Sequence, residues 1–292
     1  KLNYIYMLTI NDIRGTNPTL WNSWKHDLLK QLFMSSRKKL NLEEAESNKS
    51  IVHERKFSSA NTIKKGHALL NQVWDQLPDA YFSKYQLKQL SNQARAVAAS
   101  NGETSVFVQS RKNLIEIFIF TPNQAGLFLK TVRNFEQLSL ETIDSDIHTT
   151  NDGKYAMNTF ICRHKILGGN LIQRDIQNIE QKIINAISSE DLKAAVQLKV
   201  VHKKVFEYPT RVHVAPSVKR DASLITIETL DQPNLLSKIA NILLDNGISI
   251  DSARITTLGE KVEDNFTVVD EKTKSSISKN KSNLIQKKLK AL

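Results

Sequence analysis

Two stretches of this sequence read TPNQAGLFLKTVRNFEQLSLETIDSDIHTT, residues 121–150, and TLDQPNLLSKIANILLDNGISIDSARITTL, residues 229–258. They align without gaps at a constant offset (229 − 121 = 108). Identical residues recur at this offset: Thr121/Thr229, Gln124/Gln232, Leu127/Leu235, Lys130/Lys238, Ile147/Ile255 and Thr149/Thr257. Two copies of one small α/β unit favour a pair of binding modules, which is more typical of sensing than of turnover.

Each copy lies within a longer series of predicted strands and helices. Alternating or β-branched apolar runs predict strands, and apolar residues at every third or fourth position predict helices. Around the first copy the predicted elements are strands at 105–109 and 114–120, a helix at 124–138, strands at 140–149 and 155–162, and a helix at 172–187. Around the second they are strands at 211–215 and 224–229, a helix at 234–244, strands at 248–257 and 264–269, and a helix at 279–292.

This shared order resembles a ferredoxin-like unit whose strands are permuted. A ferredoxin-like fold runs β-α-β-β-α-β, whereas the second copy has no residues left for a final strand. The alternating segments at 105–109 and 211–215, which precede the copies, can supply a fourth strand instead. We therefore predict the order β-β-α-β-β-α in both halves, within an α+β fold class.

Residues 1–102 predict an all-α region before the first copy. Apolar residues at helical spacing are interrupted by a turn at Asn17-Pro18 and by the polar segment 35–50, which predicts a loop or a frayed helix. Helical spacing then returns and ends at the turn signal Ser100-Asn101-Gly102.

Composition and charge exclude several classes of protein. The chain has a formal net charge of +11 and no apolar run long enough to span a membrane. Its single cysteine, Cys162, excludes a disulfide framework and is typical of a cytoplasmic protein. Basic residues favour nucleic acid or acidic partners, but the aromatic residues do not alternate with them as base stacking requires. The lysines at 279–290 fit the outer face of a packed helix, so we expect neither membrane nor nucleic-acid binding.

The strand-to-helix turns at 122–126 and 231–234 are the best candidates for chemistry. A helix N-terminus has unpaired backbone N–H groups and a positive dipole end, so it attracts a carboxylate. Asp231 and Asn123 add acceptors and donors for the other groups of an amino acid, and Gly126 lets a ligand approach the backbone closely. Plain helix capping by Asp231 or Asn123 is the alternative explanation.

Both turns resemble the ligand loop of ACT domains, which are small ferredoxin-like modules that bind amino acids and regulate metabolic enzymes. The loop DQPNLL, residues 231–236, is similar to the pattern D-x-P-G-L-L except that Asn234 replaces the glycine. The loop NQAGLF, residues 123–128, keeps Gly126 but has Ala125 in place of the proline. The resemblance implies these candidate residues for binding glutamine: Asn123, Gln124, Gly126, Leu127, Asp231, Gln232, Asn234 and Leu235.

A longer part of the chain resembles the bifunctional uridylyltransferase/uridylyl-removing enzymes. The end of that family's HD-type phosphohydrolase domain is similar to YIYMLTINDIRGTNP, residues 4–18, and LWNSWK, residues 20–25. Its last domain is similar to ARITT at 253–257 and GEKVED at 259–264. Its first ACT domain is similar to the Asp-Gly turn at 152–153 with NTF at 158–160. The segments follow the family's order and span nearly the whole chain.

The resemblance implies a regulatory role. The family transfers uridylyl groups from UTP to a PII signal protein with Mg²⁺ or another divalent metal. Its HD domain removes them, and its ACT domains sense glutamine and select between the two activities. The implied division is the end of the HD domain at 1–50, a helical connector at 51–102, and ACT domains at 103–200 and 201–292.

Asp12 corresponds to the last metal ligand of the HD domain. The family's other HD ligands and its nucleotidyltransferase domain have no counterpart in this sequence. We therefore expect the C-terminal part of a longer cytoplasmic enzyme, inactive by itself and without its own cofactor. Apolar surface around Trp21 or Trp24 favours a homodimer. Two alternatives stay open: the regulatory tail of another HD-type enzyme, such as an alarmone synthetase/hydrolase, or a basic module that binds nucleic acid or an acidic protein.

Overall fold

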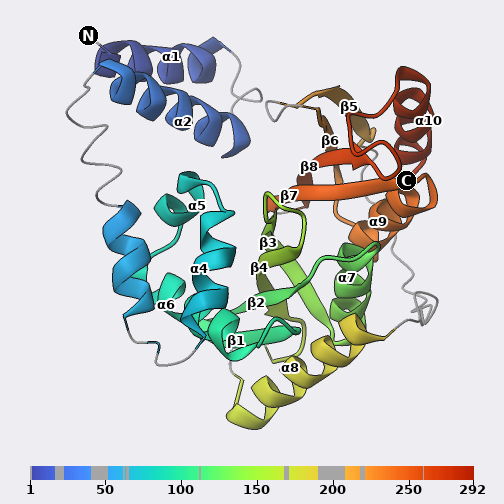
Figure 1. Ribbon diagram of the computed structural model, residues 1–292. Helices are drawn as coiled ribbons and strands as arrows, with labels where there is room; N and C mark the ends of the chain where they lie inside the picture. Colours follow the sequence, from blue (N-terminus) through green and yellow to red (C-terminus); the bar gives the residue numbers. More distant parts are fainter. Residues whose placement is uncertain are drawn as a thin grey trace. The chain divides into compact units, whose positions relative to one another are not determined.

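A computed structural model describes residues 2–16, 23–40, 52–61, 63, 66–111, 113–167, 171–189, 208–217, 221–258 and 260–292 (Figure 1). The chain divides into two units, one formed by Lys1–Asn61 with Pro78–Leu90 and the other by Thr62–Leu77 with Ser91–Leu292. The predicted turn at Asn17-Pro18 and the residue Trp21 lie outside the described residues, and so does the side chain of Trp24.

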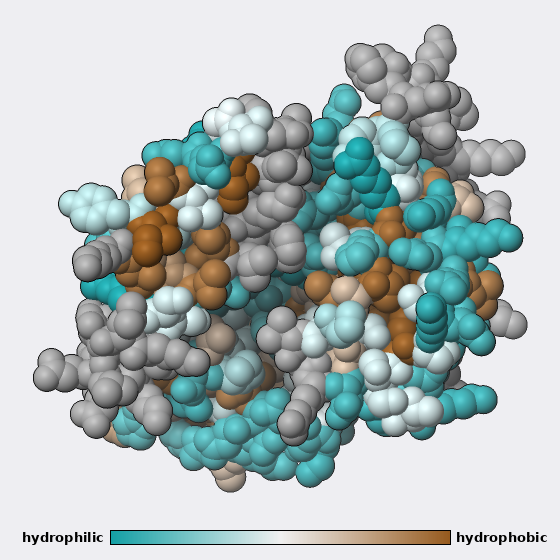
Figure 2. Space-filling model, turned by 90° about the horizontal axis from the view of Figure 1, so that it is seen from above, coloured by the Kyte–Doolittle hydropathy of each residue, from teal (hydrophilic) through white to brown (hydrophobic). Residues whose placement is uncertain are grey.

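The first unit is helical, as predicted. Its described elements are α1 (Leu2–Thr16), α2 (Ser23–Leu40), a helix at 52–60 and α5 (Asp79–Lys84). The rings of Tyr6 and Phe33 stack at 4.5 Å and join α1 to α2. Arg55 donates a hydrogen bond to the carbonyl of Phe82 over 2.9 Å. Tyr4 on α1 is 82% exposed, and the brown surface over this unit in Figure 2 shows that its helices present apolar side chains outward.

The second unit is built on one antiparallel sheet. Its strands are β1 (Ser105–Arg111), β2 (Leu114–Pro122), β3 (Leu140–Thr149), β4 (Tyr155–His164), β5 (Arg211–Pro216), β6 (Ser223–Leu230), β7 (Ile248–Leu258) and β8 (Lys261–Asp270). Its helices are α4 (His67–Asp75), α6 (Leu87–Ala99, which begins in the first unit), α7 (Leu127–Gln137), α8 (Gln173–Ser188), α9 (Leu235–Asp245) and α10 (Lys279–Lys290). The strand order is β1-β2-β4-β3-β7-β8-β6-β5. No helix in the described ranges is long and apolar enough to cross a bilayer.

The permuted order of strands is confirmed. β1 pairs with β2, with Ser105 opposite Phe120, and β5 pairs with β6, with Arg211 opposite Glu228. Each half therefore takes its outermost strand from the segment that precedes the repeated stretch. Helices α7 to α10 cover one face of the sheet, as Figure 1 shows, and the main apolar core lies between them and the strands.

The other face of the sheet differs between the halves. In β2, Ile117 belongs to the core under α7 and α8, while Phe118 and Phe120 are equally buried on the opposite face. Gln93 of α6 reaches Thr159 on that opposite face, so α6 covers it. The strand β2 is apolar along LIEIFIF, residues 114–120, because both of its faces are buried. β6 alternates buried and half-buried residues, which fits burial on one side.

The two halves meet edge to edge through equivalent strands. β3 pairs antiparallel with β7, and the central partners Asp146 and Arg254 are equivalent positions of the repeat (254 − 146 = 108). α7 and α9 are joined in the same way, because Arg133 donates to Asn241 over 3.1 Å (241 − 133 = 108). An approximate twofold axis therefore relates the halves and passes between these pairs.

The last helix is tied to the end of the sheet by an ion pair. Lys281 of α10 lies 2.6 Å from Asp270 and also donates to the carbonyl of Gly247. The lysine, together with the backbone N–H groups of Lys272 and Thr273, lowers the pKa of Asp270 to about 2. Lys279, Lys287, Lys288 and Lys290 are exposed, as predicted for the outer face of the helix, whereas Lys281 departs from that prediction because it is half-buried in its ion pair.

Replacing Lys281 by Met should lower the melting temperature at neutral pH, because Asp270 loses its partner. A depressed carboxyl pKa stabilises the fold above the unfolded value of about 3.9, and that stabilisation is lost as pH falls toward about 2. The wild-type chain should therefore lose more stability than the variant across this window. Thermal melts at several pH values measure the difference. Lys279→Met, at an exposed position of the same helix, is the control; equal acid dependence in all three proteins would contradict the assignment.

Candidate functional site

The two strand-to-helix turns have the same backbone shape. Gly126 (φ 73°) precedes α7 and Asn234 (φ 62°) precedes α9, and both lie in the left-handed region. Glycine adopts this conformation freely, and asparagine does so more readily than most residues, so Asn234 can stand where the loop pattern has glycine. These two residues are the N-caps, and neither makes a side-chain capping bond. Asn123 and Asp231 lie three residues earlier, so helix capping does not explain them.

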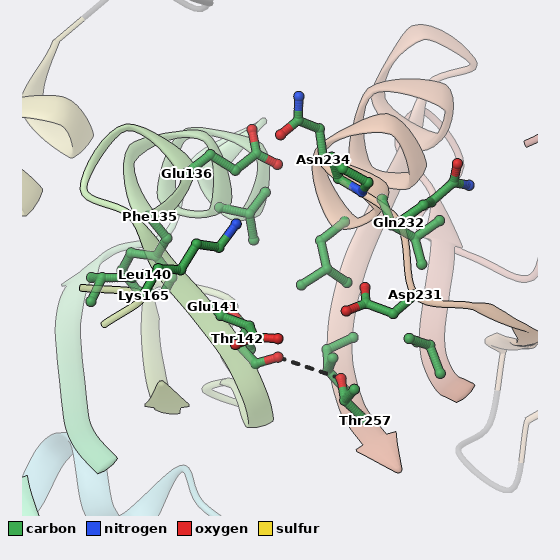
Figure 3. Close-up of a pocket in the computed structure, with 16 residues that line it drawn as sticks. Phe135, Glu136, Leu140, Glu141, Thr142, Lys165, Asp231, Gln232, Asn234 and Thr257 are labelled. Carbon is green, nitrogen blue, oxygen red and sulfur yellow. Dashed lines mark hydrogen bonds between the residues drawn. The ribbon is translucent and has the colours of Figure 1, made fainter. Parts of the chain in front are cut away.

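A cavity of about 280 Å³ lies between the two copies (Figure 3). One wall is the turn of the second copy, which contributes Asp231 and Asn234. The opposite wall is α7 and β3 of the first copy, which contribute Glu136 and Thr142. Thr257 donates to the carbonyl of Thr142 over 3.5 Å at the floor, where β7 meets β3. The cavity is thus enclosed by both copies together.

Charged groups of both signs surround this cavity. The carboxylate of Asp231 points into it from the second copy, while Glu136, Glu141 and Lys165 line it from the first. Burial raises the pKa of Glu136, and a hydrogen bond with Ser237 and the charges of nearby basic residues oppose that rise. Carboxylates, an ammonium group and the start of α9 together suit a small zwitterion, whose own charges need partners of both signs.

An equivalent cavity on the other side of the twofold axis is much smaller, about 50 Å³. Its walls are the turn of the first copy and the helix and strand of the second. The corresponding lining residues, larger cavity first, are Asp231/Asn123, Pro233/Ala125, Leu236/Phe128, Glu136/Leu244, Thr142/Ile250 and Lys165/Glu271.

Side-chain size and polarity explain why the cavities differ. Phe128 stands where the larger cavity has Leu236, and its ring packs edge-on against Phe266 at 5.9 Å. Leu244 and Ile250 replace polar residues on the facing wall. The smaller cavity has less than a fifth of the volume of the larger one (50/280) and has room for a few water molecules rather than for an amino acid. The larger cavity is therefore the candidate ligand site.

The predicted site residues divide into two groups. Of the residues that line the cavities, Asp231, Asn234 and Leu235 lie at the larger one, and Asn123, Gly126 and Leu127 at the smaller one. Asn123 donates to the carbonyl of Gly153.

Gln124 and Gln232 border the cavities, but their amide groups are engaged elsewhere. Gln124 donates to the carbonyl of Ile187 at the end of α8, and Gln232 to that of Leu292 after α10, both over 3.1 Å. Figure 3 shows the amide of Gln232 turned away from the cavity. The recurring glutamines therefore hold each closing helix to its turn.

Sequence reasoning missed the wall supplied by the other copy. Glu136, Glu141 and Lys165 lie outside the loop pattern, and pairing of the two copies brings them to the turn of the second. One signal was available. Glu136 aligns with Leu244 in the repeated helix, and a charged residue at a position that is apolar in the other copy can mark a functional difference.

Asp12, the candidate metal ligand, is exposed on α1 in the first unit. No group of three or more His, Cys, Asp or Glu side chains that could hold a metal ion occurs in the described part of the chain. One exposed carboxylate does not bind a catalytic metal ion by itself. Among the described residues, Asp12 is therefore not part of a group that could hold such a metal ion.

Comparison with known proteins identifies relatives over nearly the whole chain. A bifunctional uridylyltransferase/uridylyl-removing enzyme of a Psychrobacter species is 30% identical over 92% of this chain and 32% of its own length. Enzymes of the same name from Acinetobacter baylyi and Acinetobacter baumannii are 28% identical over 91% and 99% of the chain, and 31% and 34% of their own lengths. The chain thus spans about a third of these relatives.

No family model matches the sequence. Among solved structures, an unknown protein from Galdieria sulphuraria overlaps 53% of the chain and 80% of its own, at 12% identity. The TM-score of that overlap is 0.21, which is too low to support an argument.

Replacing Leu236 by Phe is expected to close the larger cavity as Phe128 closes the smaller one. The added ring should lower the free energy of unfolding by about 1–3 kcal/mol through overpacking. Binding of a small zwitterion should weaken at least about tenfold, because the ring takes up the space of the ligand. Urea unfolding and calorimetric titration with amino acids separate the two effects.

Phe128→Leu is the matched control at the other cavity. It should cost about 1 kcal/mol of stability and leave binding at the larger cavity unchanged. If Leu236→Phe binds as tightly as the wild-type chain, the larger cavity is not the site.

Proposed function

We propose that this chain, a homologue of the C-terminal part of the bifunctional uridylyltransferase/uridylyl-removing enzymes, is the part of such an enzyme that senses glutamine. The observation that carries the proposal is the charged cavity at the start of α9, enclosed by both copies of the repeat. On this proposal each half is an ACT module in its permuted form, and the pair forms one sensor.

The residues around the larger cavity suit the parts of an amino acid. Its α-carboxylate is attracted by the N–H groups at the start of α9 and by the ammonium of Lys165 on the facing wall. Its α-ammonium is attracted by Asp231. Asn234 at the rim, and Thr142 and Thr257 at the floor, offer hydrogen bonds to a polar side chain. Hydrogen bonds of this kind fix orientation and select among amino acids.

The charge balance of the cavity favours glutamine over glutamate. Asp231, Glu136 and Glu141 oppose one basic lining residue, Lys165. A ligand with a second carboxylate would be repelled by this excess of acids, whereas a neutral amide can donate to them. Glutamine carries such an amide and has the same size as glutamate.

The proposed ligand acts by changing the balance between two arrangements of the ACT pair. It contacts α9 on one side of the cavity and α7 on the other, so it favours the arrangement in which both walls reach it. A ligand shifts an equilibrium only by its difference in affinity for the two states. If the chain serves an enzyme with the activity of its relatives, that shift would select between two reactions: transfer of uridylyl groups from UTP to a PII protein, and their removal. Both reactions would use Mg²⁺ or another divalent metal, which would be bound outside the residues of this chain.

Calorimetric titration of the chain with glutamine tests the proposal. We expect saturable binding of about one glutamine per chain, since the second cavity is too small, and glutamate at least about tenfold weaker. Asp231→Asn removes a charged hydrogen bond worth about 1.5–3 kcal/mol and should weaken glutamine about 10- to 100-fold.

Asn123→Asp is the matched control, because it adds a carboxylate at the smaller cavity and should leave glutamine binding unchanged. Absence of glutamine binding at millimolar concentration would refute the sensing role.

A further inference from the structure

Asp264 is a carboxyl group buried beneath the larger cavity. It lies on β8, where Val262 two residues earlier and Ile255 directly opposite on β7 both line the cavity. Residues two apart on a strand, and residues paired across strands, share one face of a sheet. The side chain of Asp264 therefore lies on the cavity side, and it is 0% exposed.

The surroundings of Asp264 provide little to stabilise a charge. Neither carboxyl oxygen has a hydrogen-bond partner of good geometry among the described residues. Burial holds the pKa of Asp264 well above its ordinary value, the backbone of Thr256 opposes this, and the charges of Asp231 and Glu263 add to it. Its partners Ile227 on β6 and Ile255 on β7 are apolar, and the buried face of α9 is uncharged. The empty site thus favours the protonated acid.

The smaller cavity shows that the fold does not need an acid at this position. Ile147 pairs with Asn158 as Ile255 pairs with Asp264, so the two are equivalent. Asn158 is 1% exposed and lines the smaller cavity, and its carbonyl oxygen also has no partner among the described residues. An amide and a protonated carboxyl have nearly the same shape. The difference between the copies therefore lies in the ability to ionise.

The same substitution occurs at two equivalent pairs of positions, one in the turn and one on the strand beneath each cavity. The larger cavity has Asp231 and Asp264 where the smaller one has Asn123 and Asn158. A carboxyl at the cavity wall and a second one beneath it can provide negative charge for a cationic group, whereas two carboxamides cannot.

We infer that Asp264 is a specificity residue of the glutamine site: with Asp231 it balances the ammonium group of the bound amino acid, and it loses its proton when the ligand binds. The inference rests on the proposed function. The ligand keeps its ammonium group, the carboxyl of Asp264 becomes a carboxylate, and one proton passes to solvent. The ionised form is favoured because the ammonium brings a positive charge toward a carboxyl whose proton is retained in the empty site by burial and by the negative charges of Asp231 and Glu263.

Calorimetry in two buffers of different protonation enthalpy measures this proton directly. Titrations of the chain with glutamine between about pH 6 and 8 should show about one proton released per ligand, with the dissociation constant falling up to about tenfold per pH unit where the empty site is protonated. Glutamine binding to Asp264→Asn should release almost no proton. The affinity of this variant for glutamine should not change with pH, and at about pH 8 it should be weaker than that of the wild-type chain. A thermal melt checks that this near-isosteric variant is folded.

Two controls assign the proton to Asp264. Glu136 lines the same cavity and also has a raised pKa, so Glu136→Gln must retain the release. Asn158→Asp places an acid beneath the smaller cavity and must leave the release at its wild-type value.

The outcomes separate the two claims. Glutamine binding without proton release in the wild-type chain, or unchanged release in Asp264→Asn, overturns the inference and leaves the sensing role intact. Failure of the wild-type chain to bind glutamine overturns both. If Asp264→Asn does not fold, the wild-type buffer series and Glu136→Gln decide the matter.

Discussion

The pairing of β3 with β7 is the interaction on which the rest of the second unit depends. Each strand would otherwise be the exposed edge of a four-stranded sheet, with a row of unsatisfied backbone groups. Their hydrogen bonds make one continuous sheet and place Asp146 opposite its own equivalent, Arg254. A slip of one residue would turn every side chain of the strand to the other face. The register therefore sets the position of α7 beside α9, and with it the walls of both cavities.

The residues that the two copies share serve mainly to hold this framework. Gln124 and Gln232 fasten the closing helices, and Lys130 and Lys238 hydrogen-bond to the glutamines. The two outer strands of the sheet are each bound by the side chain of a closing helix. Glu180 accepts a hydrogen bond from the backbone N–H of Val108 on β1, and Gln286 donates one to the carbonyl of Val212 on β5. Glu180 and Gln286 are equivalent positions of the two copies (286 − 180 = 106). The identical glutamines and lysines thus serve structure, whereas a difference such as that between Phe128 and Leu236 sets the two cavities apart.

Much of the fold could be predicted because its signals are local. Alternation in β6, the isoleucine stripe of α8 and the turn at Gly247 are each read from a few neighbouring residues. The order of strands followed from these elements and from the alternating segments at 105–109 and 211–215, which precede the two copies. Identical glutamines in both loops were assigned to the ligand because the sequence does not show that Ile187 and Leu292 would be their partners.

The site was predicted only in part, because half of it comes from the other copy. The turn with Asp231 follows from a loop pattern, whereas Lys165 and Glu136 reach the cavity only through the pairing of β3 with β7. Asp264 was hidden for a different reason. It lies in the run Glu263-Asp264-Asn265, where a polar sequence predicts exposure, yet the residue is fully buried.

The continuous sheet also limits how the proposed ligand could act. Opening the cavity by parting β3 from β7 would break a row of backbone hydrogen bonds, each costly to leave unmade in a buried place. The contacts between α7 and α9 are side-chain contacts, including the hydrogen bond from Arg133 to Asn241, and can be exchanged at lower cost. A small shift of one helix along the other is therefore the cheaper motion. Because Glu136 lies on α7 and the turn precedes α9, such a shift changes the width of the cavity while the sheet stays intact.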